Sequence, residues 1–207
     1  MKKIFKLLLF FVGIAIVCAI LAAIKPYMSR TCNLDDFGIT LKVPNAYEVV
    51  ESEHTRSILS LYNSQKGIRI SALDMGKNFW GYENVTERME EYLKVISAAN
   101  YDATVQNIKR EVIELSGISV GRVEIEVVKP TKKLKTISLI MGADYGSVVI
   151  EIYGETENMN LYQAEIEELI KMIRFGKNKH VYEEIFIENN SGEISGEKIK
   201  KVIDNDK

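Results

Sequence analysis

The stretch IELSGISVGRVEIEVV, residues 113–128, decides how this chain folds. In its second half valine and isoleucine alternate with glutamate, and this period of two is typical of a β-strand with one buried face. Ser116 and Gly117 interrupt the pattern with a turn pair, after which the alternation resumes. The stretch therefore predicts an antiparallel hairpin with one strand over residues 108–115 and the other over residues 118–128.

The same hairpin contains a motif with a catalytic interpretation. Residues 117–121, Gly-Ile-Ser-Val-Gly, match G-x-S-x-G, the nucleophile motif of α/β-hydrolases. That motif works only at a turn from a strand into a helix, whereas the residues that follow here alternate as a strand. We therefore expect Ser119 to lie in the hairpin without a nucleophilic role. Arg122, Glu124 and Glu126 share the outward side of the second strand, which predicts a solvated face.

Further strands and two helices are predicted on either side of this hairpin. Apolar residues at helical spacing predict one helix from an N-cap at Asn84 to about Asn100. They predict a second helix over residues 161–173, with Asn160 and Gln163 at the spacing of a capping box. A basic connection at residues 129–134 follows the hairpin. Short alternating runs predict six more strands, at residues 37–44, 47–53, 57–62, 68–73, 136–141 and 147–153.

An unbroken apolar run, LLLFFVGIAIVCAILAAI, occupies residues 7–24. As a helix it would be about 27 Å long, close to the ~30 Å hydrocarbon core of a bilayer. Three lysines precede the run, whereas Lys25 and Arg30 follow it, and this bias favours a cytoplasmic N-terminus. We interpret the run as a transmembrane signal-anchor, with residues 1–6 in the cytoplasm and the rest of the chain outside it.

Two other interpretations of this run remain open. It could be a cleaved signal peptide, which would release a secreted protein, although no clear A-x-A site closes it. It could also be a lipoprotein signal with Cys18 as the lipidated residue, although a bulky Val17 precedes that cysteine. Both alternatives place the chain beyond residue 30 outside the cytoplasm.

Composition limits the chemistry that the exported part can perform. The 207 residues are 46% hydrophobic and 27% charged, with two cysteines and two histidines, too few for a disulfide scaffold or a four-cysteine zinc site. Five of the 27 Lys and Arg residues, and none of the 29 Asp and Glu residues, lie in residues 1–30, so the remainder is acidic. An acidic domain suits a nucleic-acid partner poorly. We expect no nucleic-acid partner, no cofactor and no metal centre.

One loop carries a candidate binding surface, residues 76–82, GKNFWGY. Phe79, Trp80 and Tyr82 are aromatic, and Lys77 adds a cation. Such a loop at the mouth of a sheet could bind a protein, a glycan or a lipid at the cell envelope. The alternative is that Phe79 and Trp80 cover the end of the hydrophobic core. His54, in a charged connection, is expected to be a solvated turn residue.

Three stretches resemble a known family. Residues 37–44, FGITLKVP, look like its opening strand; residues 113–124, IELSGISVGRVE, look like its mid-domain hairpin; and residues 169–175, LIKMIRF, look like its closing helix and terminal Phe. The family is the PsbP-like fold, shared by the photosystem protein PsbP, the periplasmic DcrB-like proteins and the yeast-type Ran-binding Mog protein. The resemblance implies an α+β domain in which a twisted antiparallel sheet is flanked by helices as an α/β/α sandwich. It brings no shared catalytic residues.

These observations predict the domain organisation and the function. Beyond the transmembrane helix we expect a juxtamembrane linker at residues 25–33 and a PsbP-like domain at residues 34–175. Residues 176–207 lose periodicity and predict a mostly mobile charged tail, in which residues 181–188 could add a strand. We predict a membrane-anchored, extracytoplasmic binding or accessory module without catalysis. The alternative is a cell-envelope enzyme with an Asp/Glu/His site that no motif locates.

Overall fold

A computed structural model describes residues 29–52, 54–76, 84–100, 103–142, 145–176, 180–188 and 194–204, together with residues 12 and 14. The predicted transmembrane run, residues 7–24, therefore lies outside the described residues except for Val12 and Ile14. Within the described ranges, no helix has the length and apolar character needed to cross a membrane. The transmembrane helix, its orientation and its alternatives stay predictions.

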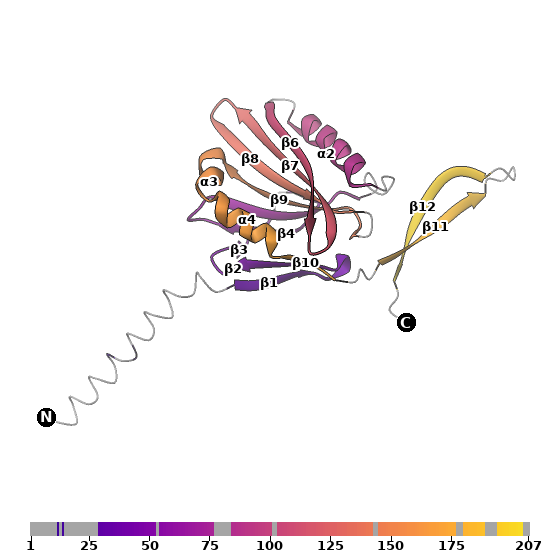
Figure 1. The fold of residues 1–207 in the computed structure, drawn as a ribbon, viewed down its shortest axis with the longest axis horizontal. Coiled ribbons are helices and arrows are strands. Elements are labelled where there is room, and N and C mark those ends of the chain that lie inside the picture. Colours follow the sequence, from indigo (N-terminus) through magenta and orange to yellow (C-terminus); the bar gives the residue numbers. More distant parts are fainter. Residues whose placement is uncertain are drawn as a thin grey trace, which may run out of the picture.

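A seven-stranded sheet is the centre of the domain (Figure 1). Its strand order is β3-β4-β5-β9-β8-β7-β6, and every neighbouring pair is antiparallel. The strands are β3 (Glu48–Val49), β4 (Ser57–Asn63), β5 (Ile68–Asp74), β6 (Thr104–Leu115), β7 (Ile118–Lys129), β8 (Lys132–Ile140) and β9 (Val148–Glu155). The hairpin predicted from residues 113–128 is confirmed as the pair β6–β7, joined by the turn at Ser116 and Gly117.

Three helices cover the two faces of this sheet, and residue alternation fixes which face each one covers. They are α2 (Val85–Ala99), α3 (Thr156–Leu161) and α4 (Gln163–Lys171). Val149 belongs to a core cluster with α2, whereas its neighbour Ile150 belongs to a cluster with α4. Because successive side chains of a strand point to opposite faces, α2 and α4 lie on opposite sides of the sheet. The PsbP-like prediction of a helix-flanked antiparallel sheet is confirmed.

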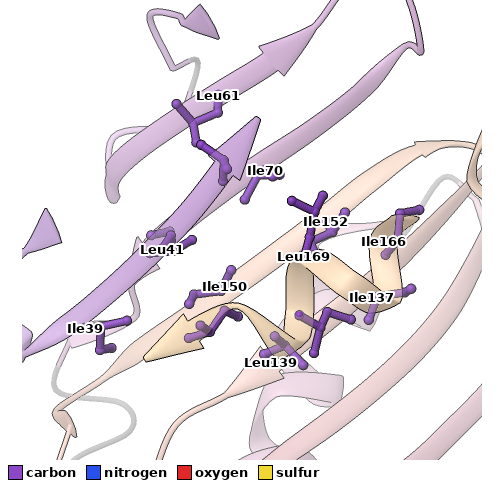
Figure 2. Close-up of a cluster of buried hydrophobic side chains, with 14 of the residues drawn as sticks. Ile39, Leu41, Leu61, Ile70, Ile137, Leu139, Ile150, Ile152, Ile166 and Leu169 are labelled. Carbon is purple, nitrogen blue, oxygen red and sulfur yellow. The ribbon is translucent and has the colours of Figure 1, made fainter. Parts of the chain in front are cut away.

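A second, three-stranded sheet adds to the α4 face. It has the order β1-β2-β10, formed by β1 (Ser29–Leu34), β2 (Ile39–Pro44) and β10 (Ile173–Phe175), with the short 3-10 helix η2 (Asp35–Phe37) before β2. Figure 2 shows side chains of β2, α4 and the large sheet meeting in one apolar cluster. We call this side the closed face. Its labelled residues are Ile39, Leu41, Leu61, Ile70, Ile137, Leu139, Ile150, Ile152, Ile166 and Leu169.

The C-terminal helix prediction is wrong in its bounds. The helical region begins at Thr156, is interrupted at Tyr162 and ends at Lys171, and Tyr162 caps α4 without a side-chain hydrogen bond. Asn160 is therefore not a capping residue; its Oδ1 accepts a hydrogen bond from Lys135 Nζ at 3.2 Å. Leu161, expected on the apolar stripe, is 74% exposed because it lies at this interruption. The predicted helix end, Ile173, is instead the first residue of strand β10, which pairs with β2.

The solvated face predicted for Arg122, Glu124 and Glu126 is also wrong. Helix α4 packs over this part of β7, and Arg122 is only 9% exposed. Its guanidinium donates to both carboxylate oxygens of Glu167 on α4, at 2.9 and 2.6 Å, and to Glu124 at 2.6 Å. These partners outweigh the desolvation of the cation and raise the pKa of Arg122. The charged residues of β7 therefore join the helix to the sheet.

Several segments differ in extent from their predictions. Part of the stretch assigned to the juxtamembrane linker is strand β1, which pairs with β2 along its whole length. The strand predicted over residues 47–53 is reduced to β3, because Tyr47 turns into the core and Val49 is 64% exposed at the sheet edge. The basic connection predicted at residues 129–134 is only the two-residue turn Pro130–Thr131, because the flanking residues belong to β7 and β8. In the tail, the predicted strand is β11 (His180–Glu188), and it pairs with a second strand, β12 (Ile194–Asp204).

Candidate functional site

Helix α2 is fixed to the sheet at its first half. The side chain of Asn84 caps it as predicted, since Asn84 Oδ1 accepts from the backbone N–H of Glu87 at 2.8 Å. The buried guanidinium of Arg88 donates to the carbonyls of Met141, at 3.2 Å, and of Gly146. A Cβ placed on Gly121 of β7 would lie 2.6 Å from Met89 Cγ, so the missing side chain at Gly121 permits this close approach.

A pocket lies beside the second half of α2, on the face opposite the closed core. Its volume is about 570 Å³, within the range of small-molecule sites. Strands β5, β7, β8 and β9 form the floor, α2 forms one wall, and the turn at residues 54–56 contributes the other side. Most of the lining is apolar: Leu73, Met75, Val95, Ile96, Ala99, Ile125, Val127 and Leu134.

A single carboxyl group, that of Glu151 on β9, lines the described part of this pocket. Glu151 is 8% exposed, and its Oε1 accepts a hydrogen bond from the Tyr92 hydroxyl at 2.6 Å. The same Tyr92 oxygen lies 2.6 Å from Ser138 Oγ, which is left to act as the donor because the phenol has one proton. Burial raises the pKa of Glu151, opposed by the Tyr92 hydrogen bond and by the charge of His54.

Glu151 belongs to a row of polar residues that crosses the sheet. Ser60, Ser71, Glu151 and Ser138 occupy directly paired positions on β4, β5, β9 and β8. Directly paired residues of antiparallel strands point to the same face, so all four lie on the α2 side. We call them the polar row. All four are buried, and the hydroxyls of Ser60 and Ser71 have no hydrogen-bond partner among the described residues.

Cations surround the pocket rather than line its centre. His54 and Arg56 lie on the turn at residues 54–56, and Arg56 Nη1 donates to the carbonyl of Met75 at 3.3 Å. Lys129 lies at the other end, where β7 turns into β8. Among the described residues, Lys129 and Arg56 form no ion pair with an acid. The charged groups of the lining are therefore one buried carboxyl and peripheral cations.

The four residues predicted as an aromatic binding surface are not among those that the structure describes. Phe79, Trp80, Tyr82 and Lys77 all lie outside the described residues, so their role stays a prediction. The described chain before these residues ends at Gly76, and its neighbour Met75 lines the pocket.

The predictions for Ser119 and His54 concern residues that the structure describes. Ser119 lies on β7, paired with Glu114 in the hairpin and not at a strand-to-helix turn, so the nucleophile motif lacks its structural context. His54 is exposed on a turn, as expected, yet it also lines the pocket. Within the described ranges, no three His, Cys, Asp or Glu side chains gather closely enough to hold a metal ion.

The polar row was missed by sequence reasoning, although the sequence contains its signal. Each of four strands has one polar residue between two apolar ones: Leu-Ser-Leu at 59–61, Ile-Ser-Ala at 70–72, Ile-Ser-Leu at 137–139 and Ile-Glu-Ile at 150–152. In isolation each triplet predicts a half-solvated strand. Their burial follows only from the register that aligns them.

An antiparallel sheet with helices on both faces defines an α+β fold class. More specifically, the domain has the PsbP fold. It is similar to cyanobacterial PsbP from Synechocystis sp. PCC 6803, with a TM-score of 0.55 and 9% identity over 72% of this chain and 92% of that one. At this identity the likeness shows the fold alone.

Weaker structural likenesses extend to two other proteins. The Ran-binding protein Mog1p of Saccharomyces cerevisiae matches with a TM-score of 0.48 and 10% identity, over 72% of this chain and 96% of that one. LpqN of Mycobacterium tuberculosis, involved in cell envelope biogenesis, matches with a TM-score of 0.41 and 11% identity, over 70% and 89%. No protein-family model and no curated protein sequence matches this chain.

Proposed function

We propose that this chain is a membrane-anchored, extracytoplasmic binding module without catalytic activity. Its ligand site is the pocket between α2 and the sheet, and its ligand is a small molecule with an apolar body. The observation that carries this proposal is an apolar cavity of about 570 Å³ that reaches a deeply buried carboxyl group. Such a combination, a mostly apolar lining with a few fixed polar groups, is typical of small-molecule sites.

A binding role is supported over an enzymatic one by the chemistry of the pocket. General acid–base or nucleophilic catalysis needs a reactive group and a partner within hydrogen-bond reach. In the described lining, Glu151 is the one carboxylate, and its Oε1 is already engaged by Tyr92. This arrangement holds the carboxyl group in place, and within the described ranges no His, Lys or Arg side chain forms a hydrogen bond with it.

The ligand site is tested by filling the pocket from α2. Ala99 lines the pocket, whereas Ala98 is exposed on the same helix and does not line it. The full chain, in nanodiscs of neutral lipid, is labelled with a diazirine analogue of hexadecanol, and labelled peptides are mapped by mass spectrometry. We expect the native chain and the A98W variant to be labelled at α2 and β8, and the A99W variant to lose most of that labelling.

Two results would overturn this site. Labelling that is equal in A99W and A98W would place the probe elsewhere, and an absence of labelling near α2 in the native chain would exclude an apolar ligand. Location is tested separately, with alkaline phosphatase fused to the C-terminus of the full chain. The enzyme should be active, since it works only outside the cytoplasm, and an inactive but intact fusion would contradict the proposed orientation.

A further inference from the structure

The distribution of charge along the pocket indicates which apolar molecules fit it. This inference rests on the proposed function, because it names the ligand class of the same site. The pocket follows the strands from Glu151 to Lys129. Register pairs Glu151 with Ser138, and Ser138 with Val123, so Lys129 lies six residues along β7 from the level of Glu151. At ~3.3 Å per residue, the two ends are about 20 Å apart.

Near the Lys129 end, which we call the outer end, the floor of the pocket is apolar. Ile125, Val127 and Leu134 line it from β7 and β8, and Ile96 and Ala99 line it from α2. Thr136 and Tyr153 provide the polar atoms of the floor between Glu151 and Leu134. A site that extends about 20 Å along the strands accommodates a linear chain better than a compact ring system.

A cluster of lysines lies at the outer end. Lys129 pairs with Lys132 across the turn from β7 to β8, and Lys133 is the next residue. Within the described ranges none of these three lysines forms an ion pair. Glu155 and Glu157 line a second hollow at the same turn together with the lysines, and neither lines the main pocket. Lys129 is the one member of the cluster that lines both hollows.

The inner end favours the opposite sign of charge. Glu151 is buried there, and an anion held beside it would be repelled whenever the carboxyl is ionised. The inner cation Arg56 is exposed, and its guanidinium is bonded to the carbonyl of Met75. His54, also exposed, is close enough to influence the titration of Glu151. An anionic group is therefore best placed at Lys129 and away from Glu151.

We propose that the ligand is a single-chain amphiphile with an anionic headgroup, a fatty acid or a molecule of that chemistry. Its headgroup lies at Lys129, and its chain runs along Val127, Leu134 and Ile125 toward Glu151. Charge complementarity fixes the direction of the chain in the pocket, and apolar contact holds it there.

Three probes that differ only in their headgroup test this proposal: diazirine analogues of hexadecanoic acid, hexadecanol and hexadecylamine. The full chain in neutral nanodiscs is labelled with each, and adducts on the α2 and β8 peptides are quantified. We expect the acid to label these peptides more strongly than the alcohol, and the amine to label them least. The K129Q variant should lose acid labelling about fivefold, with alcohol labelling unchanged.

Lys132 provides the matched control, because it lies on the same turn but does not line the pocket. The K132Q variant should keep acid labelling, and K129R should restore it. Equal labelling by acid and alcohol, or equal loss in K129Q and K132Q, would overturn the headgroup assignment and leave the pocket as an apolar site. Preference for the amine would overturn it in favour of a cation beside Glu151. If no probe labels the pocket, the proposed function itself fails.

Discussion

The two faces of the central sheet are built from the same strands and differ in how completely they are covered. On the closed face, α4 and the three-stranded sheet bury a continuous apolar cluster. On the other face α2 approaches the sheet closely at Gly121 in its first half, and a cavity remains beside its second half, where Val95 and Ile96 pack against the edge of the core. The polar row lies on this second face. The comparison predicts that stability is concentrated on the closed face, whereas the proposed ligand site lies on the face beside the second half of α2.

The largest difference between the faces should appear when leucine is truncated on each. Leu139 is fully buried on the closed face, and L139A should lower the free energy of unfolding by about 2–5 kcal/mol. Leu134 is partly buried and lines the pocket, so L134A should cost about 1 kcal/mol. Urea unfolding of the full chain, followed by circular dichroism, measures both. Similar losses would show that the two faces contribute equally to stability.

The ion pairs of the closed face should matter more than those of α2. Arg122 is nearly buried against Glu167 and Glu124, so R122L should cost about 1–3 kcal/mol because Glu167 loses this partner and Glu124 keeps the longer pair with Lys135 at 3.6 Å. On the other face Lys94 is 73% exposed in its pair with Glu91. K94Q should change the free energy of unfolding by less than about 0.5 kcal/mol. Urea unfolding measures both variants. A larger loss of unfolding free energy in K94Q than in R122L would contradict the prediction that the ion pairs of the closed face matter more.

The Tyr92 hydroxyl should contribute a moderate amount on the pocket side. Y92F keeps the ring but removes the group that joins Ser138 to Glu151, so it should cost about 1–2 kcal/mol. The lost hydrogen bond should also raise the pKa of Glu151 further, because Tyr92 donates to its ionised form. A variant as stable as the native chain would mean that water replaces the hydroxyl without loss.

The smallest effect, and the one most specific to the polar row, is a dependence on pH. Burial raises the pKa of Glu151 above its ordinary value of 4.5, so the unfolded chain loses this proton at a lower pH than the folded one. The contribution of Glu151 to stability is therefore complete below about pH 4.5 and is lost as the pH rises through the folded pKa. E151Q does not titrate, so its stability relative to the native chain should rise over that interval. Urea midpoints measured at a series of pH values check this, and parallel curves for the two chains would contradict it.

The sequence predicted best the elements whose pattern is complete within one segment. The β6–β7 hairpin and helix α2, with its cap at Asn84, have uninterrupted periodicity and clear ends, and both are confirmed. The end of α4 was misread because Ile173 continues the helical spacing, although its partner Leu41 makes it a strand. Pairing with a distant strand is not visible in the local pattern.

The site could be predicted only in part, for the same physical reason. Glu151 and Arg122 each alternate with apolar neighbours, a pattern that ordinarily indicates a solvated strand face. Their burial depends on which helix lies above them, and that follows from the tertiary arrangement. The aromatic loop had the stronger local signal, and its role as a binding surface stays a prediction.

The contact between Gly121 and helix α2 has a consequence for how this fold can diversify. The first half of the helix is fixed at Gly121, Met141 and Gly146, whereas Val95, Ile96 and Ala99 of its second half line the cavity. Because these three side chains lie on the face opposite α4, we expect substitutions there to reshape the cavity and to leave the closed face in place. A change of specificity would then need only a few replacements on one helical turn, which is a short path for evolution or for a protein engineer.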